Sequence, residues 1–248
     1  MTIKTIDLYG DGIGRVDYID HVGSDLTVVN SARVSFGIEK QEVTPRDKKL
    51  IKYLIEHKHT STLEHNVITF RFKVPLYVRS QHHRHRTWSY NEISRRYTDV
   101  DLQFYEPQAL RTQHKSNRQA SNQEDLINPT WKDSIEDWYQ EMPSFAYQWD
   151  PEQLTCSEAI KEHHEQCLKF YNYLIKVGVC REQARGVLPQ NMYTTYYGTT
   201  NLNNLMKFVG LRTHEGAQWE IAKVAEACLD IAEELFPYTV GAYREIRS

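Results

Sequence analysis

Fourteen residues in the first half of the chain combine charged and hydroxyl side chains in a way that suits anion binding. The stretch RHRTWSYNEISRRY, residues 84–97, holds four arginines, two serines and one glutamate. Arginine binds phosphate oxygens through its planar fork, and serine hydroxyls with loop amides can complete such a site. Glu92 cannot bind a phosphate, but it can accept a hydrogen bond from a sugar hydroxyl or hold an arginine in place. Phosphate and sugar together predict a nucleotide.

Each basic cluster also has a purely structural explanation. Arg84, His85 and Arg86 could be cations that interact favourably with a helix C-terminus, and the same holds for Arg185 and for Arg212 in their own segments. That explanation does not extend to the arginines and serines that follow the end of the predicted helix.

Composition limits the ligand classes. The chain has 248 residues, 40% of them hydrophobic, and a formal net charge of −3, which disfavours a dedicated binder of long nucleic acid and favours a small phosphorylated ligand. We expect no membrane span and no signal peptide. The four cysteines show no CxxC pair, so we expect reduced thiols and a cytoplasmic protein.

The sequence gives little support for a metal site or for a cysteine nucleophile. Two histidine groups occur, at 57–65 and 82–85, but neither has a metal-site spacing, and we predict no metal. Cys167 and Cys228 lie on apolar helical stripes, where an inert thiol is usual. We identify no histidine or helix N-terminus beside Cys156 or Cys180, so no cysteine is a candidate nucleophile.

The N-terminal elements that would position the motif follow from periodicity. The first 35 residues read as short β-rich runs between turns. Residues 47–59 share an apolar helical face, and residues 66–74 alternate as a half-buried strand. Pro75 is well placed to open a helix through 76–86. The motif would then continue into a loop.

The second half of the chain is more helical. We expect a surface excursion over residues 106–156 with some helix at 131–142, a helix over 158–179, and a strand at 192–197. Asn201 would cap a helix over 202–212, and a last helix would cover 216–236. The irregular alternation predicts an α+β fold, in which long helices flank an antiparallel-rich sheet.

The motif resembles the signature of the flavin-dependent thymidylate synthases, R-H-R followed after seven residues by S. Arg84, His85, Arg86 and Ser94 carry it. The preceding HTSTLEHNVITFRFKVPLYVRSQ and the later REQARGVLPQNMYT, NLMKFVGLRT and AQWEI are similar to the family as well, so the resemblance covers roughly residues 50–100 and 165–240 in order.

The resemblance implies a single domain over residues 1–248 that assembles as a homotetramer with sites built from more than one subunit. It implies methylation of dUMP to dTMP with methylenetetrahydrofolate, NADPH and FAD, without a cysteine adduct. Nucleic acid and membranes are not expected partners. Arg212 would polarise the uracil ring, a role suited to a fixed cation beside a developing anion.

Site residues follow from the matched positions. The resemblance assigns dUMP binding to Gln81, Arg84, Glu92, Ser94, Arg95, Arg96, Arg185 and Arg212. It assigns FAD binding to His59, Ser61, Arg84, His85, Arg86, Glu92, Asn201, Asn203 and Lys207. Some positions depart from the family pattern: HTSTLEH lacks the proline and phenylalanine often found there, Ser61 stands where threonine is usual, and Lys207 where some relatives have asparagine.

Two other functions remain open from the sequence. Trp88, Tyr90 and Tyr97 among basic residues could stack the bases of single-stranded RNA. Alternatively, the protein could be a flavoprotein of this fold that only oxidises NADPH, because every named residue could bind ligands without catalysing methylation.

Overall fold

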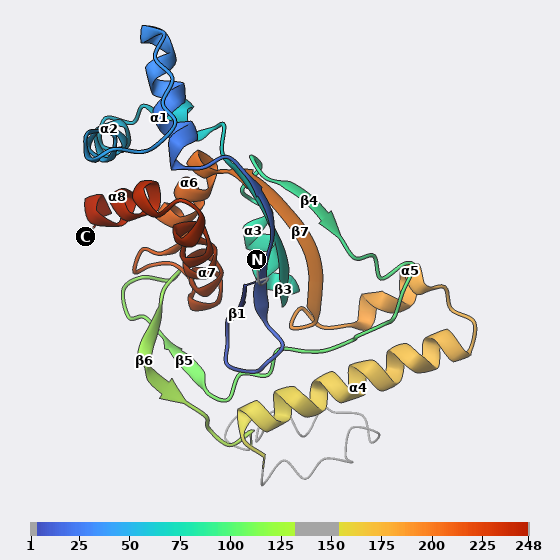
Figure 1. Ribbon diagram of the computed structural model, residues 1–248. Coiled ribbons are helices and arrows are strands. Elements are labelled where there is room, and N and C mark those ends of the chain that lie inside the picture. Colours follow the sequence, from blue (N-terminus) through green and yellow to red (C-terminus); the bar gives the residue numbers. More distant parts are fainter. Residues whose placement is uncertain (1–3, 132–153, 248) are drawn as a thin grey trace. The chain divides into compact units, whose positions relative to one another are not determined.

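The computed structural model describes residues 4–131 and 154–247 (Figure 1). Contacts divide the chain into two compact units. The first comprises the residues up to Ile93 together with those from Thr194 onward, and the second comprises Ser94–Tyr193. The helix predicted at 131–142 lies outside the described residues except for its first position.

A five-stranded sheet forms the centre of the first unit, in the order β1-β2-β3-β7-β4. β1 pairs with β2, β2 with β3, and β4 with β7, each antiparallel. The predicted strands at 66–74 and 192–197 correspond to β3 and β7. The bounds are β1 Thr5–Asp7, β2 Arg15–Val22, β3 Val67–Pro75, β4 Ser89–Glu92 and β7 Tyr193–Asn201.

Helices of the first unit pack beside this sheet. α7 contacts β2, α3, α6 and α8, while α2 packs against α8 and α1 (Figure 1). The bounds are α1 Asp25–Arg33, α2 Pro45–Glu56, α3 Leu76–His82, α6 Leu202–Arg212, α7 Trp219–Leu235 and α8 Pro237–Arg247, with short 3-10 turns η1 Val34–Phe36 and η2 Thr60–Leu63. Together with the sheet, these helices confirm the α+β prediction.

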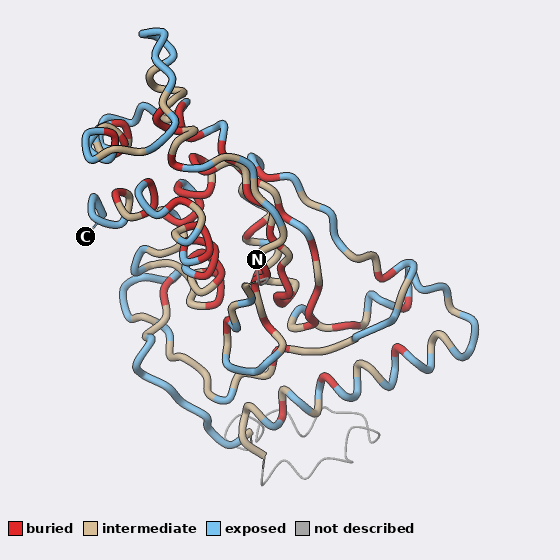
Figure 2. The backbone as a smooth tube through the Cα atoms, in the orientation of Figure 1, coloured by how far each residue is buried: buried red, intermediate tan, exposed pale blue. Residues whose placement is uncertain are grey.

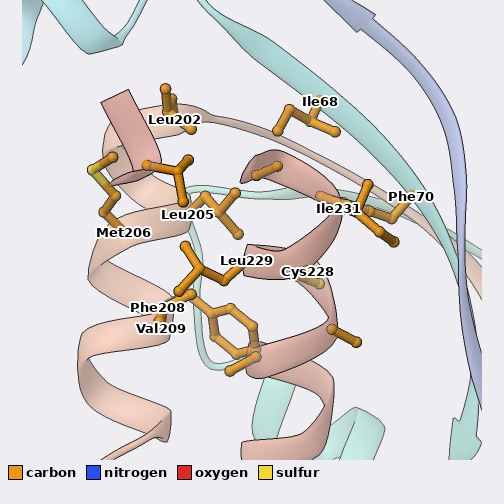
Figure 3. Packing of buried hydrophobic residues seen from close by; sticks show 14 of the residues in the cluster. Ile68, Phe70, Leu202, Leu205, Met206, Phe208, Val209, Cys228, Leu229 and Ile231 are labelled. Carbon is orange, nitrogen blue, oxygen red and sulfur yellow. The ribbon is translucent and has the colours of Figure 1, made fainter. Parts of the chain in front are cut away.

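The core of this unit lies between the sheet and the pair α6–α7. Figure 3 shows Phe208 and Leu205 of α6 facing Cys228 and Leu229 of α7, with Ile68 of β3 nearby. Phe208, Leu205, Cys228 and Ile68 have no exposed surface. The apolar face predicted for residues 216–236 is therefore the buried face of α7, and burial of each large apolar side chain stabilises the fold by about 1.5–3 kcal/mol.

The predicted β-rich runs before residue 36 are in part wrong, because residues 25–33 form helix α1. Ser24 and Thr27 make a capping box, in which each side chain accepts a hydrogen bond from the other residue's backbone N–H. This reciprocal cap starts the helix. Val28 and Val29 are then fully buried, so packing outweighs the strand preference of β-branched residues.

The stretch after α3 is also more regular than predicted. Residues 89–92 form β4, the edge strand beside β7, with Tyr90 opposite Gly198. A Cβ atom on Gly198 would lie 2.8 Å from the Phe72 ring and 3.3 Å from Trp88. Glycine at this position therefore lets both aromatic rings pack against the sheet.

The second unit contains a long helix and a hairpin. α4, Cys156–Lys176, is capped by Thr155, and exposed residues alternate along it with intermediate and buried ones (Figure 2). The predicted excursion at 106–156 is not irregular throughout, because β5 Leu110–Gln113 pairs with β6 Ser121–Ile127. Short turns follow α4, namely α5 Arg181–Ala184 and η5 Arg185–Val187. None of the helices in the described part of the chain combines the length and apolarity that a bilayer crossing requires.

Candidate active site

The turn that follows α3 carries the R-H-R sequence and is anchored by its own backbone and by Tyr90. The helix ends at His82, four residues earlier than predicted, so Arg84 and Arg86 lie beyond its last turn. His85 N–H donates to the carbonyl of His82 at 2.9 Å. The Tyr90 hydroxyl lies 2.9 Å from the same carbonyl and 3.2 Å from that of His85. Strand β4 thereby holds the turn.

His82 places its ring in the core beneath this turn. It is fully buried, stacks on Phe208 with ring centroids 4.6 Å apart, and bonds through Nδ1 to the Tyr196 hydroxyl at 2.8 Å. Burial lowers the pKa of His82 well below its ordinary value, so the ring is neutral.

Arg212, at the end of α6, is fixed by His85 of the turn and by Gln81 of α3. Its Nε donates to Nε2 of His85 at 3.0 Å, and its Nη2 donates to the backbone carbonyl of Gln81 at 3.2 Å. Burial, together with the Arg212 charge, lowers the pKa of His85 to about 4. Neutral His85 can therefore accept from the arginine, while burial also lowers the pKa of Arg212.

Glu92 is held by two residues of the first unit. Its Oε1 accepts from the Thr194 hydroxyl at 2.7 Å and lies 3.2 Å from Nε of Arg79 in an ion pair. The sequence reasoning did not include Arg79 or Thr194. Arg79 precedes Glu92 by thirteen positions on a different element, so only the pairing of β4 with the sheet shows the contact.

The two outer arginines of the signature are available for a ligand. Arg84 and Arg86 are exposed, and within the described residues their side chains have no hydrogen-bond or ion-pair partner. Exposed, uncompensated guanidinium groups on a rigid turn suit phosphate oxygens.

In the second unit, Arg95 and Arg96 differ in what they contact. Arg95 is only 8% exposed, and its guanidinium donates to the carbonyls of Val100, Asp101 and Tyr193. A buried guanidinium engaged by main-chain carbonyls holds the loop, and the contact of Arg95 with dUMP stays a prediction. Arg96 has a half-exposed side chain and pairs with Glu182 at 3.3 Å.

Ser94 and Arg185 occupy turns of the same unit. The Ser94 hydroxyl accepts from Arg96 N–H at 3.3 Å, and its carbonyl accepts from Tyr97 N–H at 3.0 Å. Arg185 is exposed at the start of η5. These two amides are engaged within the turn, so the Ser94 hydroxyl hydrogen is the donor that this serine can offer to a ligand.

His59 and Ser61 line one pocket of the first unit, as their shared FAD assignment would require. The pocket has a volume of about 450 Å³ and is also lined by Ser31, Lys58 and Thr60. Lys58 has a backbone φ of +57°. Such a conformation is costly for a residue with a side chain and often occurs where a ligand is bound.

The remaining FAD assignments lie on α6, and two of them already have structural partners. Asn201 caps the helix by accepting from Asn204 N–H at 2.9 Å, as predicted. Asn203 is buried and donates to Glu64 at 2.8 Å. Lys207 is exposed. The asparagines thus order α6 and η2, while Lys207 offers a cation.

Thiol and metal chemistry remain weakly supported. Burial raises the pKa values of Cys167 and Cys228, which leaves both protonated. Contrary to the sequence reasoning, Cys156 and Cys180 both stand at helix N-termini, Cys156 as the first residue of α4 and Cys180 as the N-cap of the four-residue α5. Within residues 4–131 and 154–247, no three His, Cys, Asp or Glu side chains converge as metal ligands would.

Comparison with known proteins gives consistent matches. Residues 17–238 match the family described as thymidylate synthase complementing protein. A flavin-dependent thymidylate synthase of Thermus thermophilus is 38% identical over 245 residues, covering 99% of this chain and 79% of its own. The corresponding enzyme of Thermosipho africanus is 38% identical over 233 residues, covering 93% and 90%.

Solved structures agree with these matches. The UMP/dUMP methylase PolB of Streptomyces cacaoi, bound with 5-Br dUMP, is 31% identical with a TM-score of 0.75, covering 97% of each chain. The same protein bound with 5-Br UMP gives a TM-score of 0.72 over 93% of each chain.

Proposed function

We propose, since this chain belongs to the thymidylate synthase complementing protein family, that it methylates dUMP to dTMP as a flavin-dependent thymidylate synthase. The carbon donor would be methylenetetrahydrofolate and the reductant NADPH. The observation that carries the proposal is the fixed Arg212, held by His85 of the signature turn and by the carbonyl of Gln81 in α3.

Arg212 can act on a uracil ring because its orientation is set before substrate binds. Two of its five N–H groups are used by His85 and Gln81, so three remain for a ligand. A cation held this way stabilises negative charge that develops on the ring during methylene transfer, and it needs no reorganisation to do so.

The residues of the first unit fit FAD. Arg84, Arg86 and Lys207 are exposed cations suited to a pyrophosphate, and the polar pocket at His59 and Ser61 has room for part of a dinucleotide. When bound, FAD supplies the hydride for the reaction. His85 would orient Arg212 from the flavin side of the turn, and Asn201 and Asn203 would order the helix beside it.

The nucleotide would be held by both negatively and positively charged side chains. We assign Glu92 to the sugar or flavin, kept in place by Arg79 and Thr194. Ser94, Arg96 and Arg185 would bind the phosphate. Arg95 would order the loop on which those groups lie.

Further properties of the family belong to the same proposal. We propose a homotetramer in the cytoplasm and a single functional domain that includes both compact units, because the family match spans them. No cysteine adduct would form, since Cys228 is buried with a raised pKa.

A second candidate substrate is UMP, because the structural relative PolB is described as a UMP/dUMP methylase. The two nucleotides differ only at the ribose 2′ position. A third outcome would be NADPH oxidation without methylation.

One assay separates these functions. Purified protein is incubated anaerobically with NADPH, methylenetetrahydrofolate and either dUMP or UMP, and nucleotide products are resolved by chromatography. We expect dTMP, formed only when every component is present, and a flavin absorbance spectrum. A methylated product from UMP alone would identify the second substrate. NADPH oxidation without a methylated nucleotide would contradict the proposal.

A further inference from the structure

Three polar side chains form a chain of hydrogen bonds that ends at Gln81. Gln218 precedes the first turn of α7, Glu220 lies in that turn, and Gln81 lies in the last turn of α3. Gln218 Nε2 donates to Glu220 Oε2 at 2.9 Å. Gln81 Nε2 donates to Gln218 Oε1 in a short hydrogen bond. We name Glu220, Gln218 and Gln81 the amide relay.

The carboxylate sets the direction of the whole relay. An ionised glutamate can only accept, so Gln218 must turn its NH₂ group toward Glu220. Its carbonyl oxygen then faces Gln81, so Gln81 must donate a hydrogen bond from its own NH₂ group. Reversing both amides would place the carbonyl oxygen of Gln218 against the Glu220 carboxylate, so this orientation follows from the chemistry of the groups.

The far end of the Gln81 amide is consequently an acceptor. Its Oε1 receives no hydrogen bond from any residue that the structure describes, and the side chain is half-buried. The main-chain carbonyl of the same residue holds Arg212 at 3.2 Å. Gln81 therefore joins the relay to the residue assigned to the uracil ring.

The relay is anchored in the fold. Glu220 is only 3% exposed, and its backbone carbonyl accepts from the Tyr9 hydroxyl at 3.4 Å. Gln218 is the N-cap residue of α7, yet its side chain makes no capping hydrogen bond. Its amide is thus available for the relay without loss to the helix.

We infer that Glu220 and Gln218 are positioning residues that fix Gln81 as an acceptor, so that the site selects a nucleotide presenting an N–H or O–H donor to it. This inference rests on the proposed function and adds to it a basis for discrimination. A half-buried group held as an acceptor disfavours a ligand that offers another acceptor to it.

Two groups of dUMP supply such a donor, the N3–H of the uracil and the 3′-hydroxyl of the sugar. Cytosine has an unprotonated N3 that would face Oε1 as a second acceptor. A 2′,3′-dideoxy sugar lacks the hydroxyl. Comparing dUMP with dCMP and with 2′,3′-dideoxyuridine monophosphate therefore shows whether the N3–H or the 3′-hydroxyl donates to Gln81.

The variants are Glu220→Gln and Gln218→Met. Glu220→Gln keeps the shape of the side chain but lets the Gln218 amide adopt either orientation. Gln218→Met keeps an apolar side chain of similar length at this half-buried position but cannot hydrogen-bond to Glu220 or Gln81. Glu226→Gln is the matched control, because it makes the same change on the same helix at an exposed residue that pairs only with Lys223 among the described residues. Flavin absorbance verifies that each protein is folded and loaded.

The measurement is calorimetric titration of each FAD-loaded protein with the three nucleotides. We expect the wild-type protein and Glu226→Gln to bind one analogue at least about a hundredfold more weakly than dUMP. In both relay variants dUMP affinity should fall about tenfold, and the discrimination against that analogue should shrink about tenfold.

Unchanged affinities and discrimination in the relay variants, with dUMP bound normally by the wild-type protein, would overturn this inference alone. An equal loss in Glu226→Gln would also overturn it, because the effect would then belong to the helix. Failure of the wild-type protein to bind dUMP would overturn the proposed function together with the inference.

Discussion

Arg212 donates a hydrogen bond from Nε to Nε2 of His85 across 3.0 Å, and the two residues lie 127 positions apart in the chain. The contact requires a neutral imidazole with its proton on Nδ1, since protonated Nε2 could not accept. Burial and the arginine charge both lower the pKa of His85, to about 4. The end of α6 and the signature turn are thus joined through a histidine that stays uncharged near neutral pH.

This pairing predicts a pH dependence of stability. Above pH 6.5 His85 is neutral in both the folded and the unfolded chain. As the pH falls from about 6.5 to about 4, the unfolded chain takes up a proton that the folded chain does not, so the free energy of unfolding decreases across this window. His82, whose pKa is also lowered by burial, acts in the same direction.

The variant His85→Gln tests the assignment. A glutamine oxygen can still accept from Arg212 but does not titrate. Urea unfolding at pH 7 and pH 5 should show a smaller loss of stability in the variant than in the wild-type protein. Equal losses in the two proteins would show that His85 does not contribute.

We expect Arg79 to support nucleotide binding by positioning Glu92, although Arg79 lies outside the R-H-R signature. Its ion pair with Glu92 at 3.2 Å holds the carboxylate in one orientation. Arg79→Met should raise the KM for dUMP about tenfold, with a smaller change in kcat, because a ground-state contact is weakened. Arg79→Lys should recover part of the loss. Steady-state kinetics at varied dUMP measure both, and an unchanged KM in the methionine variant would contradict the role.

Replacing all four cysteines by alanine should leave turnover within about tenfold of the wild-type rate. Cys228 is fully buried in the core beside α6 (Figure 3), so its replacement should cost about 1–2 kcal/mol of stability. The assay is dTMP formation by protein shown to be folded from its circular dichroism spectrum. Loss of turnover in a single folded cysteine variant would restore a covalent mechanism.

Local sequence patterns correctly predicted the elements whose buried face appears as a regular spacing of apolar residues. The alternation at 66–74 gives β3, and the apolar stripe of 216–236 gives α7, because one face of each must be buried. Asn201 as an N-cap follows from the hydrogen bond that its side chain can make. The family resemblance named both His85 and Arg212, and the fold joins these two residues by a hydrogen bond.

The predictions that were wrong or missing concern structure that depends on contacts between residues distant in sequence. Strand β4 has an irregular polar sequence, and it exists because β7 offers it a partner at Gly198. Helix α1 was mistaken for strand because its valines favour strands, while its cap and buried face decide otherwise. The contacts of Arg79 with Glu92 and of Gln81 with Gln218 join separate elements, so no local pattern could predict them.

The central claim is that Arg212 stabilises charge on the uracil ring, whereas Arg96 only binds the phosphate. The most direct measurement is the single-turnover rate of dTMP formation at saturating dUMP with reduced, FAD-loaded Arg212→Ala and Arg96→Ala proteins. The account predicts a rate lower by about 10²–10³ for Arg212→Ala, partly restored in Arg212→Lys, and a rate near wild type for Arg96→Ala. A near wild-type rate for Arg212→Ala at saturating dUMP would contradict it.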